Sequence, residues 1–339
     1  MIQKIAIYGA GAIGGWLGAK LAGAGCDVSV VARGATLAAL QQYGLRLVEA
    51  AGTAAQPVRA SSDPVALGAQ DLVIVAVKAP ALLEVARHIA PLIGTDTIVL
   101  TAMNGVPWWF FESFGGALAG TALQAVDPTG EIARAMPARQ VIGCVVHASC
   151  SVDAPGVIRH HFGNGLIVGE PSGLSTDRVQ ALAALLQRAG FAATVSPQIQ
   201  KDIWYKLWGN MTVNPISAIT GATTDLILGD ELVRGFVSSV MLEAKEIGAR
   251  FGIPIEQQPE DRHAVTRKLG AFKTSMLQDV EAGRPLEIDA LVGAVHEIGR
   301  HLALPTPNLD ALFGLARLMA RQRGLYPASP PEPATPGAA

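Results

Sequence analysis

The chain has 339 residues and half of them are hydrophobic, so it is long enough to form two domains with sizeable cores. A net charge of −2, without a basic cluster, gives no reason to expect a nucleic acid or an anionic membrane as partner. The three cysteines have no CxxC spacing, which argues against a disulfide framework and against a zinc site. We therefore expect a reduced, cytoplasmic setting and no bound metal.

The sequence predicts neither a signal peptide nor a membrane span. Its first residues run directly into a strand pattern, and no uncharged apolar run of about 20 residues lacks proline, asparagine or several glycines. We therefore expect a soluble protein.

A glycine-rich motif follows the first predicted strand, residues 5–8, and leads into a helical pattern over 15–22. It has the form GxGxxG and consists of Gly9, Ala10, Gly11, Ala12, Ile13 and Gly14. The first glycine permits a tight turn, the second lets a pyrophosphate approach the backbone, and the third allows close packing of helix on strand. The free N–H groups at the helix start suit an anion. The motif predicts a dinucleotide site, although a glycine-rich turn without a ligand would share the pattern.

The second predicted strand, residues 27–32, ends at Arg33 rather than at an acidic residue. NAD-selective sites usually carry an acid here for the ribose 2′-hydroxyl, whereas arginine suits a 2′-phosphate. The sequence therefore favours NADPH as cofactor. The alternative is that Arg33 is a solvated loop residue.

Two further strands, residues 71–77 and 97–101, lead to Lys78 and to Asn104-Gly105. The carboxyl ends of parallel strands share one edge of the sheet, where ligands bind in doubly wound folds. We expect Lys78 and Asn104 to meet the cofactor there. An ordinary surface lysine and an ordinary turn are the alternatives.

The aromatic run at 108–111 is expected to pack in the core rather than to cover the cofactor. A strand pair follows at 141–148 and 157–162. His160 and His161 are adjacent, so they point to opposite faces of a strand and are not expected to share a metal.

A polar stretch with proline and glycine near residues 169–173 indicates a domain boundary. We expect a Rossmann-type domain at 1–172, an all-α domain at 173–325 and a mobile low-complexity tail at 326–339. The fold class is thus α/β, with a doubly wound sheet followed by helices. The expected helices are 176–190, 199–218, 230–252, 258–282, 286–303 and 308–323.

A further candidate for chemistry is Lys206, the only charge between Asp202 and Asp225. In a helix, Asn210 and Asn214 share its face at spacings of four and eight residues. The apolar flanks of this face would leave Lys206 partly desolvated, where an ammonium gives up its proton more readily and can act as a general acid. The alternative is a structural lysine that reaches to water.

Two more polar points stand out in the helical half, Ser275 and Glu287. Glu287 follows Pro285 in the first turn of a helix, where the dipole favours an acid in any case.

These motifs together resemble the ketopantoate reductase (2-dehydropantoate 2-reductase) family over nearly the whole chain. The motifs that carry the resemblance are the GxGxxG turn, Lys78, Asn104-Gly105, Lys206-Leu207-x-x-Asn210-x-x-x-Asn214-Pro215, Ser275-Met276-x-Gln278-Asp279 and Glu287-Ile288-Asp289.

The resemblance implies roles for single residues. Lys206 matches the family's proton donor, Asn210, Asn214 and Ser275 match its substrate-binding residues, and Glu287 matches a carboxylate near cofactor and substrate. Arg33, Lys78, Asn104 and Ser149 match positions around the dinucleotide, and Asn104 also lies near the substrate. The implied reaction is hydride transfer from NADPH to a 2-oxo acid such as ketopantoate. We also expect a homodimer formed through the helical domain.

The chain departs from the family pattern at Thr224 and Phe272, where well-studied members carry asparagines. A less polar pocket would favour a 2-oxo acid with an apolar side chain over ketopantoate.

Two rival functions remain. An opine or hydroxyacyl dehydrogenase is one, but the hydroxyacyl type requires a catalytic histidine, and no histidine outside the strands follows a predicted strand end; those histidines are His88, His263, His296 and His301. A non-catalytic NADP(H)-binding redox sensor is the other, and it would have no use for Lys206.

Overall fold

The computed structural model describes residues 2–327, and they form two compact units. The first unit comprises the chain up to Leu207 together with Phe251–Ile253, and the second comprises Trp208–Arg250 and the chain from Pro254 onward. Helix α6 (Ile199–Thr220) contributes residues to both units.

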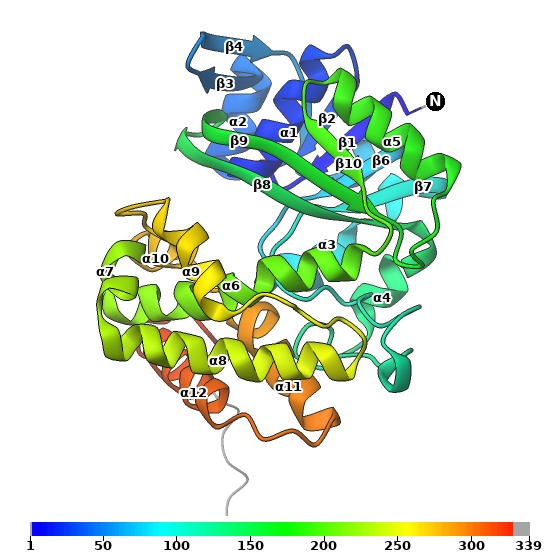
Figure 1. Ribbon diagram of the computed structural model, residues 1–339. Helices are drawn as coiled ribbons and strands as arrows, with labels where there is room; N and C mark the ends of the chain where they lie inside the picture. The colour runs from blue at the N-terminus through cyan, green and yellow to red at the C-terminus, as the bar shows by residue number, and fades with distance from the viewer. Residues whose placement is uncertain (1, 328–339) are drawn as a thin grey trace, which may run out of the picture. The chain divides into compact units, whose positions relative to one another are not determined.

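Within the described residues, ten strands of the first unit form one sheet (Figure 1). The strand order is β4-β3-β9-β8-β7-β6-β1-β2-β5, and β10 also pairs with β9. The strands are β1 Lys4–Tyr8, β2 Asp27–Val31, β3 Leu45–Glu49, β4 Gly52–Gln56, β5 Arg59–Ser61, β6 Gln70–Val75, β7 Ile93–Thr101, β8 Val141–Ala154, β9 Val157–Gly169 and β10 Ala192–Val195.

The strands from β5 through β2, β1, β6 and β7 to β8 are all parallel. Their order is that of a doubly wound dinucleotide-binding sheet. The predicted α/β class, with a Rossmann-type sheet ahead of a helical region, is confirmed. β8 and β9 form the expected antiparallel pair.

Helices cover this sheet because its central strands are buried on both faces. The helices are α1 Ala12–Gly23, α2 Gly34–Tyr43, α3 Leu82–His88, α4 Glu131–Ala135 and α5 Asp177–Arg188. Helix α1 packs on β1 and β3 and adds Trp16, Leu17 and Leu21 to the core, all of them fully buried.

One strand lies beyond the boundary expected near residue 172. β10 pairs in parallel with β9, with Ala193 opposite Leu166, and α5 packs against both strands. The first unit consequently extends to Leu207 and includes both elements. With only four residues, β10 is too short to show a recognisable alternating pattern.

The aromatic run at 108–111 is buried in the core of the first unit, as expected. The ring centre of Phe110 lies 5.9 Å from that of Phe251, and Trp204 lies 4.8 Å from the same ring. The short return Phe251–Ile253 thereby adds an aromatic side chain to this core.

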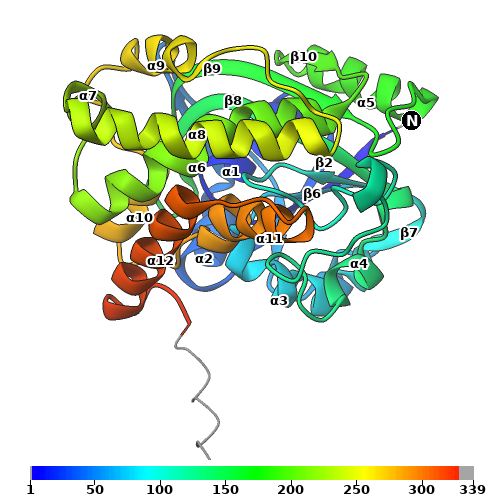
Figure 2. The ribbon, with the colours of Figure 1, turned by 60° about the horizontal axis from the view of Figure 1, so that its bottom comes forward.

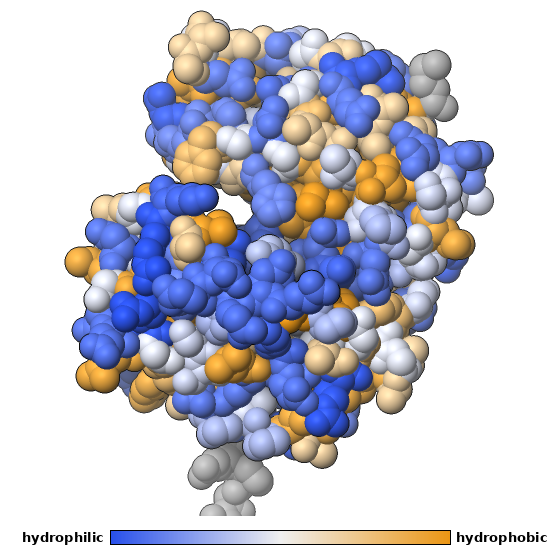
Figure 3. Space-filling view, in the orientation of Figure 1, coloured by the Kyte–Doolittle hydropathy of each residue, from blue (hydrophilic) through white to orange (hydrophobic). Residues whose placement is uncertain are grey.

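The second unit is helical (Figure 2). Helix α8 packs against α7, α9, α11 and α12, and its outer face is mostly hydrophilic (Figure 3). The helices are α7 Thr224–Gly229, α8 Glu231–Arg250, α9 Pro259–Arg267, α10 Ser275–Glu281, α11 Ala294–His301 and α12 Pro307–Gln322, and a π-helical turn, Asp289–Gly293, precedes α11.

The single helix expected over 258–282 is wrong, because α9 ends at Arg267 and α10 begins at Ser275. Gly270 has a φ of +63°, which interrupts helical geometry. Thr274 then caps α10, because its hydroxyl oxygen accepts a hydrogen bond from the Leu277 amide at 3.2 Å.

The expected tail, 326–339, falls mostly outside the described residues. Its first residue, Tyr326, is described, and the hydroxyl donates a hydrogen bond to Asp289 at 2.6 Å. No helix within residues 2–327 is long and apolar enough to cross a membrane.

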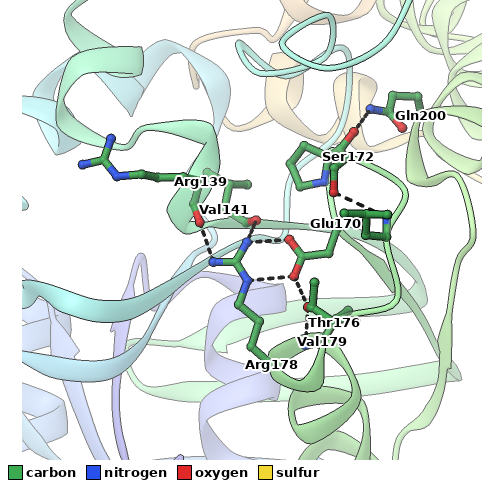
Figure 4. A network of polar contacts seen from close by, with 10 residues as sticks. Arg139, Val141, Glu170, Ser172, Thr176, Arg178, Val179 and Gln200 are labelled. Carbon is green, nitrogen blue, oxygen red and sulfur yellow. Dashed lines mark hydrogen bonds and ion pairs between the residues drawn. The ribbon is translucent and has the colours of Figure 1, made fainter.

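A partly buried ion pair joins the end of β9 to α5 (Figure 4). Arg178 donates to both carboxylate oxygens of Glu170, which is 3% exposed, and also to the carbonyl oxygens of Arg139 and Val141. Thr176, the cap of α5, donates to the same carboxylate. One guanidinium thus connects three separate segments of the first unit.

We expect Arg178→Met to lower the free energy of unfolding by about 3 kcal/mol, because the buried Glu170 carboxylate loses its countercharge. Urea denaturation followed by circular dichroism measures this loss. The control is Arg250→Met, which breaks an exposed pair with Glu246 and should cost less than about 0.5 kcal/mol. Equal losses from the two variants would contradict the expectation.

Candidate active site

The glycine-rich turn joins β1 to α1 at the carboxyl end of β1. Gly9 has a φ of +104°, and a Cβ there would lie 2.8 Å from Cγ1 of Val77. At Gly14 a Cβ would lie 2.0 Å from the carbonyl oxygen of Gly9. Neither position has room for a side chain, so the shape of the turn depends on glycine.

Gly11 is different, because a Cβ there would meet nothing within 4 Å. It precedes α1, whose first turn has neither a side-chain cap nor an acidic residue. The amides of this turn are thus available to an anion that the helix dipole favours. With the half-buried Ala10, Ala12 and Ile13, these residues fit the pyrophosphate of a dinucleotide.

Arg33 directly precedes α2, just after the end of β2. Its Nη1 lies 2.5 Å from Oε1 of Glu84, in the first turn of α3. Hydrogen bonding to Glu84 raises the pKa of the Arg33 guanidinium above its ordinary value. Arg33 thus has an ion-pair partner although its side chain is exposed, and sequence reasoning missed Glu84 because no motif marks it.

Lys78 and Asn104 follow neighbouring parallel strands, β6 and β7. Lys78 precedes a 3-10 turn at Ala79–Ala81, and Asn104 leads into Gly105, which has a φ of +86°. Both residues lie beyond the carboxyl ends of their strands, where the sequence predicted them. Ser149 lies further along the sheet in β8, opposite Phe162 of β9.

Lys206 connects three segments of the first unit. Its Nζ donates to Oδ1 of Asn104 at 2.9 Å and to the carbonyl oxygen of Val146, in β8, at 2.8 Å. The lysine itself comes from α6 and is half-buried. Two acceptor oxygens thus fix the direction of the ammonium and keep it beside Asn104.

The thiol of Cys144 lies close enough to Lys206 to feel its charge. Burial raises the pKa of this thiol to about 12, and the lysine charge acts in the opposite direction. The thiol stays protonated at neutral pH, so it provides neither a nucleophile nor a countercharge for Lys206.

Asn210 and Asn214 lie one and two turns after Lys206 on α6, as the spacing predicted. Asn214 is only 8% exposed. Within the described residues 2–327, neither carboxamide makes a hydrogen bond. A buried amide of this kind is suited to a ligand's hydroxyl or carbonyl group.

Ser275 and Glu287 belong to the second unit. Ser275 is the exposed first residue of α10. Glu287 is 7% exposed, and its backbone carbonyl accepts a hydrogen bond from the Leu291 amide at 3.1 Å, just ahead of the π-helical turn. π-helical turns occur frequently at functional sites.

The two positions that depart from the family pattern lie side by side in the second unit. The Thr224 amide donates to the carbonyl oxygen of Phe272 at 3.0 Å, and the Thr224 hydroxyl donates to that of Gly270 at 2.7 Å. The hydroxyl is thus committed to the backbone, and Thr224 is 2% exposed. Neither side chain carries a carboxamide, so this pair is less polar than two asparagines would be.

Comparison with known protein families gives matches over most of the chain. Residues 5–173 match the family model described as ketopantoate reductase PanE/ApbA, and residues 198–320 match that of its C-terminal part. A 2-dehydropantoate 2-reductase of Mesorhizobium japonicum is 50% identical over 325 residues, which cover 96% of this chain and all of the relative.

Solved structures show the same fold. A crystal structure from Ralstonia solanacearum, assigned to the ketopantoate reductases, is 60% identical with a TM-score of 0.93 and covers 96% of this chain and all of that one. A PanE/ApbA family ketopantoate reductase from Ralstonia eutropha is 28% identical with a TM-score of 0.81, over 95% and 100% of the two chains. Both family models and the full-length similarity show that the chain belongs to the ketopantoate reductase family.

Proposed function

We propose that the protein is a 2-dehydropantoate 2-reductase-like enzyme that reduces ketopantoate, or a related 2-oxo acid, to the 2-hydroxy acid with NADPH. The family uses NAD(P)H, and the full-length relative from Mesorhizobium japonicum bears the name of this activity. When bound, NADPH would supply the hydride that forms the new C–H bond at the ketone carbon. The protein has to supply a proton to the ketone oxygen.

Lys206 is the proposed proton donor, and its fixed ammonium is the observation that carries the proposal. Asn104 and the Val146 carbonyl accept from Nζ and therefore stabilise the protonated lysine and set its direction. An ammonium in this position would polarise the ketone and donate its proton as alkoxide character develops. This interaction is strongest in the transition state and therefore accelerates the reaction.

The proposed substrate-binding groups are Asn104, Asn210, Asn214 and Ser275. The carboxamides of Asn210 and Asn214 follow Lys206 along the same helix, so they would bind the carbonyl and a nearby hydroxyl. The Ser275 hydroxyl and the start of α10 would bind the carboxylate. Glu287 is a buried carboxylate in the proposed catalytic machinery, where it would bind a hydroxyl of substrate or cofactor.

NADPH rather than NADH is the proposed cofactor, with Gly9–Gly14, Arg33, Lys78, Asn104, Ser149 and Glu287 as its binding residues. The uncapped α1 start supports a bound pyrophosphate. The arginine after β2, where NAD-selective enzymes carry an acid, supports a 2′-phosphate. A homodimer formed through the helical region and a cytoplasmic location stay predictions.

Lys206→Arg separates proton donation from structure. A guanidinium keeps the positive charge and much of the stem but is a far poorer acid, so we expect kcat/KM to fall by about 10² or more. The dissociation constant of NADPH should change little, because the dinucleotide rests on the glycine turn. Steady-state kinetics and fluorescence titration measure the two effects.

Lys206→Ala should show the same separation of catalysis from cofactor binding. The exposed Lys201 on the same helix provides the control, and Lys201→Arg should keep full activity. Near-normal turnover by Lys206→Arg would rule out the proton-donor role, and so would a Lys206→Ala variant that loses only thermal stability.

Cofactor choice can be tested at Arg33. We expect NADPH to bind more tightly than NADH, and Arg33→Asp to reduce or reverse this preference because an acid repels the 2′-phosphate and can accept from a 2′-hydroxyl. Titration with each nucleotide gives the ratio of dissociation constants. Equal affinities in the unmutated protein would contradict the expectation.

Substrate range follows from Thr224 and Phe272. We expect a 2-oxo acid with an apolar side chain to be reduced as well as ketopantoate or better, because the pocket lacks two carboxamides. NADPH oxidation over a panel of 2-oxo acids gives kcat/KM for each, and Phe272→Asn should shift the order toward ketopantoate. Efficient turnover of ketopantoate alone by the unmutated enzyme would show that these two positions do not set the substrate range.

A further inference from the structure

An ion pair crosses the carboxyl end of the first strand of the sheet. β1 pairs with β2 on one side and with β6 on the other. Arg33 follows β2, and Glu84 lies in the helix that follows β6. Their 2.5 Å contact therefore passes over the end of β1, where the glycine-rich turn begins.

Tyr8, the last residue of β1, adds a third group to this pair. Its side chain is 6% exposed and lies close enough to Arg33 for the guanidinium charge to act on the phenol. Burial is the main cause that raises the pKa of the phenol, so Tyr8 is neutral at physiological pH. The guanidinium thus has a carboxylate and a phenol beside it.

The Glu84 carboxylate would disfavour binding of a 2′-phosphate and favour binding of a 2′-hydroxyl. The phosphate needs the guanidinium that Glu84 already binds, and its negative charge is repelled by the same carboxylate. A ribose hydroxyl can instead donate a hydrogen bond to a carboxylate, as it does to the acid of NAD-selective sites. The Arg33–Glu84 pair should therefore give a weaker preference for NADPH over NADH than an arginine alone would give.

We propose that Glu84 sets the ratio of NADPH to NADH affinity by competing with the 2′-phosphate for Arg33. This inference rests on the proposed function, because it requires the nucleotide to bind at this edge of the sheet. Both side chains are about half exposed, at 57% for Arg33 and 52% for Glu84, so solvent screens their attraction. Removal of the carboxylate should accordingly change the affinity ratio by roughly fivefold.

The test is titration of Glu84→Gln with NADPH and with NADH, at low and at high salt. We expect NADPH to bind roughly fivefold more tightly, NADH to bind no more tightly, and the gain to shrink at high salt. Glu131→Gln is the matched control. It also removes one negative charge, and it removes the carboxylate partner of Arg87, another residue of α3. The control should leave the ratio unchanged.

Glu84→Gln combined with Arg33→Gln identifies the cause of the gain in NADPH affinity. If Glu84 competes for the arginine, most of the gain from Glu84→Gln should disappear there, whereas an undiminished gain would overturn the proposal. An unchanged ratio in Glu84→Gln, or weaker NADPH binding, would also overturn it. In either case an unmutated protein that binds NADPH and reduces 2-oxo acids would keep the proposed function intact.

Discussion

The close approach of α1 to the sheet is the constraint on which the proposed dinucleotide site depends. Gly14, Gly15 and Gly18 face the sheet, and a Cβ at any of them would lie 3.0 Å or less from another atom. Because three glycines remove this obstacle, the helix start lies directly at the end of β1, with its amides at the sheet edge. Strand order then places the ends of β2, β6 and β7 along the same edge.

The elements that sequence reasoning located share a strong pattern. β1, β2 and β6 are mostly apolar because helices cover both faces of the sheet, and each is followed within three residues by a glycine or a charged side chain. The sequence pattern did not predict a very short strand, nor a turn that lies between two helices of continuous spacing. β10 has too few residues to alternate, and helical spacing on both sides of Gly270 concealed the turn between α9 and α10.

The candidate site was predictable as a set of strand ends but not as a set of contacts. Lys206 and Asn104 were each marked by local patterns, yet 102 residues separate them in sequence and no local rule pairs them. Glu84 is one of many exposed acids, and it gains a partner at Arg33 only because the folded chain brings α3 near the residues that follow β2. Polar pairings of this kind depend on the folded chain, so sequence periodicity carries no information about them.

The second acceptor of Lys206 is a main-chain atom, the carbonyl oxygen of Val146. Every amino acid has this carbonyl, so substitution at position 146 changes the packing of β8 without removing the hydrogen bond. A mutational scan would therefore score this residue as tolerant of other apolar side chains although its backbone contacts the proposed proton donor. Asn104 supplies a side-chain acceptor, so a substitution at position 104, unlike one at position 146, removes a hydrogen bond from the lysine.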